Sequence, residues 1–209
     1  MSAPPRPTIP TLADLPLVIE TGRLRMRPIA ESDVDALWPV VSDPQFPVHM
    51  SWEAHTDKSQ TREFIAQVSE ELRKGTGITW AIEHGGMAQG CIGLHGIKWQ
   101  LRAWRVDRAE LGYWLAPALW GKGLMTEAAH AVVRWGFESL GLHKVTVGCF
   151  AENAASRRVI EKVGFRYIGR LDDDVWRAGR WWSHLRFELT EPEWPDVHTT
   201  MRVSRPRRT

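Results

Sequence analysis

A glycine-bearing turn placed directly before an amphipathic helix constrains this chain more than any other feature. Residues 120–127 read Trp-Gly-Lys-Gly-Leu-Met-Thr-Glu and follow a strand-like run over residues 110–116. Glycines let backbone amides approach a ligand closely, and the helix that follows directs its positive end to the same point. Apolar residues then recur at three- and four-residue steps, at Met125, Ala128, Ala129, Val132, Val133, Gly136, Phe137 and Leu140. The segment predicts a strand, an anion-binding turn and a helix packed on a sheet.

The residue order in this turn differs from two common phosphate-binding loops. A Walker-type loop needs Gly, four residues, Gly, Lys and then Ser or Thr, and a dinucleotide loop needs G-x-G-x-x-G; the chain contains neither. The turn instead resembles motif A of the GNAT N-acetyltransferase superfamily, (Gln/Arg)-x-x-Gly-x-(Gly/Ala). Trp120 stands where Gln or Arg is usual, and Met125 stands where Gly or Ala is usual.

Three other stretches extend the resemblance to the Rim-type branch of that superfamily, the N-terminal acetyltransferases of ribosomal proteins. Residues 19–28 with 32–37 resemble its opening strand and first helix, and residues 110–115 (Glu-Leu-Gly-Tyr-Trp-Leu) resemble its fourth strand. Residues 153–165, from Asn153 to Phe165, resemble its motif B. The likeness runs in one order from about residue 19 to residue 189.

The resemblance and the patterns together predict an α/β fold with a mixed sheet. The central sheet is expected to be mostly antiparallel, with about seven strands splayed between the fourth and fifth and about four flanking helices. Expected strands are 20–28, 78–83, 89–97, 110–116, 144–150, 165–171 and 181–189, and expected helices start near Ser32, Asp57, Met125 and Asn153. Residues 98–108, with Trp99 and Trp104, are expected to form a strand extension and a loop near the substrate mouth.

Composition predicts one compact domain: 209 residues, 43% of them hydrophobic and 25% charged. We expect a flexible proline-rich leader over 1–17, the acetyltransferase domain over 18–192 and a basic tail over 193–209. The net charge of +2 argues against nucleic acid as a partner. No run reaches the roughly eighteen apolar residues of a membrane span, which favours a cytoplasmic protein without membrane contact. Cys91 and Cys149 lack metal-ligand spacing, so we expect reduced core thiols and no metal.

The resemblance implies acetyl-CoA, or another acyl-CoA such as succinyl-CoA, as the acyl donor. Trp114 and Leu115 are expected to border the acyl arm, and Asn153 and Ser156 to contact the pantetheine and the sulfur. Some of the basic residues Lys122, Arg157, Arg158 and Lys162 are expected to meet the CoA phosphates, Lys122 and Arg158 among them. The pyrophosphate itself is expected on the turn formed by Gly121, Lys122, Gly123, Leu124, Met125 and Thr126.

The implied reaction is direct attack of an amine on the thioester, and the amine must first lose a proton. Glu110 is the first candidate for the base; its alternative is a structural pairing with an arginine at position 25, 27 or 108. Asp174, Asp173 and His184 are the next candidates. Many relatives protonate the leaving thiolate with a tyrosine from the motif B helix, but Ile160 occupies that position here. Ser156, one turn earlier, is the expected hydrogen-bond donor to the sulfur.

Several alternatives stay open at this level. The acceptor is a protein N-terminus, a lysine or a small-molecule amine, and a homodimer is one option for the assembly. Arg25, Arg27, Arg102 and Arg105 leave open an acidic acceptor or an acyl group that carries a carboxylate, such as succinyl. The missing tyrosine leaves open a regulatory protein that binds acyl-CoA without turnover. Among the 12 tryptophans, we expect two or three ligand contacts from Trp52, Trp99, Trp104, Trp120, Trp176, Trp181 and Trp182.

Overall fold

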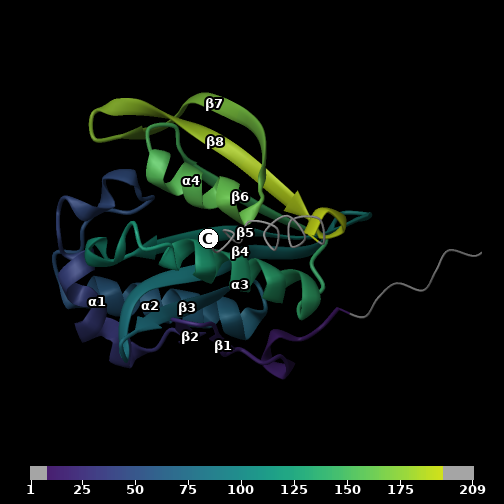
Figure 1. The fold of residues 1–209 in the computed structure, drawn as a ribbon, viewed down its shortest axis with the longest axis horizontal. Coiled ribbons are helices and arrows are strands. Elements are labelled where there is room, and N and C mark those ends of the chain that lie inside the picture. The colour runs from purple at the N-terminus through teal and green to yellow at the C-terminus, as the bar shows by residue number, and fades with distance from the viewer. Residues whose placement is uncertain (1–8, 195–209) are drawn as a thin grey trace, which may run out of the picture.

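The computed structural model describes residues 9–194, which form one eight-stranded sheet in the order β1-β2-β3-β4-β5-β6-β8-β7 (Figure 1). Every neighbouring pair is antiparallel except β5 and β6, which are parallel. The strands are β1 (Ile19–Glu20), β2 (Arg25–Pro28), β3 (Ile78–His84), β4 (Met87–Leu101), β5 (Trp104–Leu115), β6 (Lys144–Phe150), β7 (Arg166–Arg177) and β8 (Arg180–Thr190). The predicted fold class is confirmed.

The sheet has one strand more than expected because the first predicted strand is a small hairpin. Residues 20–28 were expected to run straight, but the chain turns between Thr21 and Leu24, where the Thr21 amide donates to the Leu24 carbonyl. Gly22 lies inside this turn, and β1 pairs back on β2.

Four α-helices cover the two faces of the sheet within the described residues: α1 (Val34–Val41), α2 (Lys58–Lys74), α3 (Leu124–Glu138) and α4 (Ala154–Val163). The side chains that α1 and α2 bury form one core cluster with Ala81, Cys91 and Trp114. The side chains that α3 and α4 bury belong to a second cluster with Trp80, Ile82 and Leu111. Successive residues of a strand point to opposite faces, so the central strands contribute side chains to both clusters.

The helix boundaries follow the capping signals in the sequence. Asp57 and Gln60 form the predicted capping box, and Gly75 ends α2 with a φ of 70°. Asn153 caps α4 by accepting from the Ser156 amide, and Gly164 ends it with a φ of 103°. The start of the first helix differs from the prediction of a cap near Ser32. A 3₁₀ turn, Glu31–Asp33, precedes α1, and the carboxylate of Asp33 accepts a hydrogen bond from the Ala30 amide.

The predicted leader and tail need correction where the structure describes them. The leader was expected to be flexible to residue 17, but Leu12 is buried, and the carbonyls of Pro16 and Leu17 accept from the indoles of Trp135 and Trp80. Prolines prevent a helix, yet they leave carbonyls free to accept such bonds. The domain also extends two residues past 192, because Trp194 is buried against Phe137. The rest of both segments, including Arg202, Arg205, Arg207 and Arg208, lies outside the described residues.

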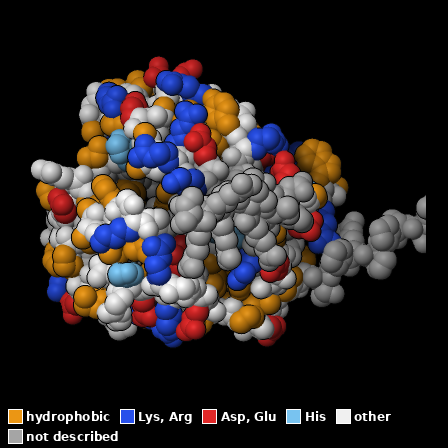
Figure 2. Space-filling model, viewed as in Figure 1, with side chains coloured by type: hydrophobic (Ala, Val, Ile, Leu, Met, Phe, Trp, Pro, Cys, Tyr) orange, Lys and Arg blue, Asp and Glu red, His pale blue; other side chains and the backbone are white. Residues whose placement is uncertain are grey.

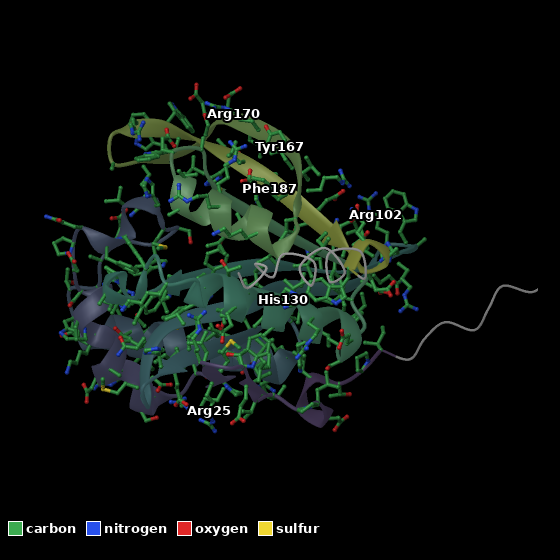
Figure 3. All side chains as sticks on the ribbon, viewed as in Figure 1. Arg25, Arg102, His130, Tyr167, Arg170 and Phe187 are labelled. Atoms are coloured by element: carbon green, nitrogen blue, oxygen red, sulfur yellow. The ribbon has the colours of Figure 1, made fainter. Side chains whose placement is uncertain are left out.

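The loop predicted near the substrate mouth lies elsewhere. Strands β4 and β5 form a long hairpin that turns at Arg102, beside the pair Leu101 and Trp104. Arg102 marks one end of the molecule in Figure 3, whereas the β7–β8 turn lies at the other end in Figure 1. Trp99 on β4 and Trp104 on β5 lie towards the turn at Arg102, and neither lines the cleft described below, which begins at Leu111. None of the described helices is long and apolar enough to cross a membrane.

Candidate active site

A cleft opens where the two parallel strands separate. Pairing between β5 and β6 ends at Leu111 and Val147; beyond this point β5 stays with β4, and β6 stays with β8. The cleft has a volume of about 570 Å³. Its walls come from both faces of the sheet: the turn before α3 and the start of α4 on one face, and Phe46, His49 and Met50 on the other. The splay predicted for this strand pair is confirmed, and it makes the cleft a passage through the sheet.

The glycine turn forms one wall of the cleft with the geometry that its sequence predicts. Gly121 and Gly123 have φ values of 73° and 75°, a region that favours glycine. Gly123 caps α3 without a side-chain hydrogen bond, so amides at the start of this 15-residue helix remain available to an anion. The predicted residues that line the cleft here are Gly121, Gly123, Leu124, Met125 and Thr126. Lys122 differs, because its exposed side chain is not part of the lining.

Trp120 explains how the turn tolerates a residue other than Gln or Arg. Its indole Nε1 donates to the carbonyl of Leu115 at 2.6 Å, which ties the turn to the last residue of β5. Its ring also lies 6.2 Å, between centroids, from Phe46 on the other face. Trp120, Trp114 and Leu115 all line the cleft.

The start of α4 forms the facing wall and contributes the motif B residues. Asn153, Ser156 and Arg158 line the cleft, as does Lys162 one turn further on. The Ser156 hydroxyl lies 2.9 Å from the hydroxyl of Tyr113 on β5. Burial raises the pKa of Tyr113 above its usual range, so the phenol stays protonated.

Tyr113 is a site residue that the sequence reasoning missed. It was considered only as an apolar neighbour of Glu110. The available signal was its place in residues 111–115 at the end of the strand, because every residue of this run lines the cleft. The motif B tyrosine is replaced at Ile160, but a phenol from β5 reaches Ser156, one turn earlier on the same helix.

Glu110 has a different environment from the one expected. Its side chain is 54% exposed and forms an ion pair with Arg186, at 3.1 Å, instead of being desolvated by Tyr113 and Trp114. Arg186 reaches it across Gly148, where an added Cβ would lie 3.1 Å from Nη1. Glu110 does not line the cleft. The alternative of an arginine partner is correct in kind, but the arginine is Arg186 and not one of those at 25, 27 or 108.

Asp174 and His184 come together at the base of the β7–β8 arm, where His184 on β8 pairs with Phe150, the last residue of β6. Asp174 Oδ2 lies 2.8 Å from His184 Nδ1. The imidazole stacks on Phe150, with 4.4 Å between ring centroids, and Phe150 lies 6.4 Å from the cleft residue His49. Since a carboxylate only accepts, Nδ1 carries the proton and a neutral ring keeps its lone pair on Nε2. Neither residue lines the cleft directly.

The tryptophans divide differently from the expectation. Trp120 lines the cleft, and Trp52 packs on its edge, 6.3 Å from Trp114 between centroids. Trp176 and Trp181 pack on each other and are exposed on the β7–β8 hairpin.

Arg25 and Arg27 pair with Glu83, and Arg102 and Arg105 lie at the far hairpin, so these arginines give no support for a carboxylated acyl group in the cleft.

A second groove of about 540 Å³ adjoins the cleft along α3. Gly123, Thr126 and Lys162 line both, and Arg134 lines the groove. Among the described residues, no acidic side chain forms an ion pair with Lys162, Arg158 or Arg134. On the face of the molecule drawn in Figure 2, Lys and Arg side chains lie interspersed with Asp and Glu side chains. The combination of uncapped helix amides, left-handed glycines and unpaired cations fits a ligand with several phosphates.

The two cysteines are free thiols, and both are buried. Cys149 nevertheless lines the cleft, where burial raises its pKa to about 11. Within residues 9–194 no group of three His, Cys, Asp or Glu side chains is placed to hold a metal ion.

Comparison with known proteins assigns the chain to a family. Residues 23–166 match the family described as the acetyltransferase (GNAT) domain. The chain belongs to the GNAT acetyltransferase family. It is 28% identical over 177 residues to the uncharacterized N-acetyltransferase YoaA of Bacillus subtilis, which covers 84% of this chain and 97% of YoaA.

Two solved structures share the fold of this acetyltransferase. One is RimL, described as a ribosomal L7/L12 alpha-N-protein acetyltransferase in complex with coenzyme A, with a TM-score of 0.76, 19% identity and coverage of 83% of this chain and 97% of RimL. The other is Mycobacterium smegmatis RimJ in complex with CoA-disulfide, with a TM-score of 0.76, 24% identity and coverage of 87% and 90%. These two likenesses concern the fold, and the family match over residues 23–166 makes the protein a GNAT acetyltransferase.

Proposed function

We propose that this acetyltransferase moves the acetyl group of acetyl-CoA to the α-amine of a protein N-terminus. The observation that carries the proposal is the cleft that passes through the sheet between β5 and β6. It separates a phosphate-binding face from an aromatic face, so donor and acceptor can enter from opposite sides and meet without exchanging places. The description of RimL, which names a protein amino terminus as the acceptor, supports the choice among amines.

On the donor face, amides from Gly121 to Thr126 would bind the pyrophosphate, and Lys162 and Arg158 would approach the outer phosphates. Arg134, in the adjoining groove, extends the same positive surface. Bound acetyl-CoA supplies an activated thioester. The free backbone edge of β5 near Trp114 and Leu115 would hold the acyl arm and polarise its carbonyl.

Ser156 is proposed to donate a hydrogen bond to the sulfur as the thiolate leaves. Its own amide is fixed by Asn153 at 3.0 Å, and its oxygen is fixed by Tyr113. When the phenol donates to the Ser156 oxygen, the serine proton is free to point into the cleft. A thiol with a pKa near 8.5 is a good leaving group as its thiolate, so a hydrogen bond to the sulfur is sufficient and a strong acid is not needed.

On the acceptor face, we assign proton removal from the ammonium to His184, oriented by Asp174. An imidazole with a free ring nitrogen can accept a proton, and the Asp174 hydrogen bond selects the tautomer with a free Nε2. The ring packs on Phe150, which in turn contacts Trp182 and the cleft residue His49. Glu110 is the competing base, since it lies on the strand that forms the cleft, but its charge is already engaged by Arg186.

The test combines an acceptor panel with three variants. Purified enzyme, acetyl-CoA and three acceptors would be followed by mass spectrometry: peptides with a free N-terminus and no lysine, N-terminally blocked peptides with lysine, and a polyamine. Acetylation confined to the first set supports the proposal; acetylation confined to another set moves the acceptor to that class. Calorimetric binding of acetyl-CoA with no product from any acceptor would support the regulatory alternative, and tighter binding of succinyl-CoA would change the donor.

The base is tested by comparing His184→Gln, Asp174→Asn and Glu110→Gln. Under the assignment, His184→Gln lowers kcat at least about a hundredfold and removes the acidic limb of the pH profile. Asp174→Asn lowers kcat by a smaller factor, and Glu110→Gln leaves the pH profile in place. A loss of kcat in Glu110→Gln alone would return the role to Glu110.

A further inference from the structure

The turn between β1 and β2 reaches across the molecule to the phosphate-binding turn. The Arg23 guanidinium donates from Nε to Glu127 Oε2 at 2.7 Å and from Nη1 to the Lys122 carbonyl at 2.9 Å. The Arg23 amide and the Thr21 hydroxyl both donate to Glu127 Oε1, at 3.0 Å and 2.6 Å. Four hydrogen bonds thus join segments about a hundred residues apart in sequence. No family motif quoted above includes this contact.

Glu127 presents an electrostatic problem for this site. It lies in the first turn of α3, next to Thr126 of the cleft wall, and its side chain is 22% exposed. Burial acts to raise its pKa, but hydrogen bonds from Thr21 and Arg23 outweigh burial and hold the pKa below its usual value. The carboxylate is therefore negative at neutral pH, beside a helix start that must receive a phosphate anion. An uncompensated charge there would repel the ligand.

Arg23 addresses both the shape and the charge of the turn. Its bond to the Lys122 carbonyl fixes the peptide between the two left-handed glycines, Gly121 and Gly123. Its Nη2 lies 2.6 Å from Glu127 Oε2 and 3.7 Å from the place where a Cβ on Gly123 would stand. The guanidinium thus cancels the Glu127 charge at the turn itself. Half of the Arg23 side chain is exposed.

We propose that Arg23 is a positioning residue of the acetyl-CoA site, which holds the phosphate-binding turn in its binding conformation and neutralises Glu127. The inference rests on the proposed function of that turn and adds a strand-turn residue that lies outside both motifs. It predicts an effect on acetyl-CoA binding that depends on Glu127. A merely structural ion pair would not produce that dependence.

The experiment is a calorimetric double-mutant cycle in the full-length protein with acetyl-CoA as the probe. Arg23→Met keeps the aliphatic stem of the side chain and is expected to raise the Kd for acetyl-CoA about tenfold. This factor corresponds to roughly 1.4 kcal/mol of binding free energy. Glu127→Gln alone should leave the Kd unchanged or lower it, because it removes the repelling charge. The double variant should bind at least about threefold more tightly than Arg23→Met alone. Steady-state kinetics should show a raised KM for acetyl-CoA with kcat nearly unchanged.

Arg25→Met is the matched control. Arg25 lies two residues away on the same hairpin and pairs with Glu83 at 2.8 Å instead of with the turn; it marks the lower edge of the molecule in Figure 3. Its Kd should stay within about twofold of the wild type. Unchanged binding in Arg23→Met, or no recovery in the double variant, overturns the inference while wild-type binding keeps the proposed function intact. Failure of the wild type to bind acetyl-CoA would overturn both.

Discussion

Arg177 holds the β7–β8 hairpin against the acceptor side of the cleft, and its removal gives the sharpest prediction about that side. The guanidinium donates to three carbonyls: that of Val48, inside the 3₁₀ helix Phe46–His49, at 3.1 Å, and those of Met50 and, at 3.0 Å, Trp52, which follow this helix. It also pairs with the exposed Glu53 at 3.0 Å. Only 11% of its side chain is exposed, so solvent replaces little of this network in the folded state.

The magnitude follows from the three carbonyl bonds. A hydrogen bond contributes about 1 kcal/mol net, and Arg177→Met keeps most of the apolar stem, so unfolding should become easier by about 3 kcal/mol. For a chain of this size that corresponds to a fall of roughly 6–12 °C in Tm. The Glu53 pair is left out because its carboxylate is exposed.

The assays separate the two sides of the sheet. Thermal and urea unfolding should show the loss of stability, and kinetics should show a raised KM for the acceptor, because the hairpin carries Asp174 and borders His49 through Trp182. Calorimetric acetyl-CoA affinity should stay within about twofold, since the phosphate-binding turn lies on the other face. Arg170→Met is the control: Arg170 also lies on β7, near the upper edge of the molecule (Figure 3), but it bonds the exposed Asp172 and the Ser183 hydroxyl and none of these three carbonyls, so its Tm should fall clearly less than that of Arg177→Met. The reasoning is refuted if Arg177→Met keeps the wild-type Tm, or if acetyl-CoA affinity falls in parallel with acceptor affinity.

Three further predictions follow from the site and its support. Tyr113→Phe removes only the hydroxyl that fixes Ser156; kcat should fall about three- to tenfold with the acetyl-CoA Kd unchanged, and an unchanged kcat would contradict a role for this contact. Gly123→Ala places a Cβ at a φ of 75° and should cost about 1–2 kcal/mol and weaken acetyl-CoA binding, whereas Gly86→Ala at a φ of 83° on the β3–β4 turn should destabilise without affecting binding. The hydrogen bond from Arg25, aided by Arg27, holds the pKa of Glu83 below its usual value; Glu83 therefore stabilises the fold above its unfolded pKa of about 4.3, and this contribution is lost as pH falls through the folded pKa. The Tm of Glu83→Gln should accordingly lie below the wild-type value at pH 7 and approach it in acid; a difference that grows in acid would contradict the assignment.

Local signals in the sequence were sufficient for most elements of the fold. The capping box at Asp57, the Asn153 cap and the glycines that end α2 and α4 lie where the sequence predicted them, because each depends on neighbouring residues only. The stripe from Met125 to Phe137 is buried as predicted. The errors occur where distant segments decide the outcome. Indoles from β3 and α3 anchor the predicted leader, and pairing of β1 with β2 turns one expected strand into two.

The sequence by itself determined the phosphate-binding turn, because left-handed glycines and a helix start are properties of consecutive residues. Only the tertiary structure decided which charges and hydroxyls meet around it. Glu110 forms an ion pair with Arg186 across Gly148, and Glu127 accepts a hydrogen bond from Arg23. The Ser156 hydroxyl contacts Tyr113 on another strand, and Asp174 contacts His184. The physical reason is that most of these pairs join residues far apart in the chain. Strand register and the face of the sheet on which each residue lies determine which residues meet, and no local sequence pattern encodes either of them.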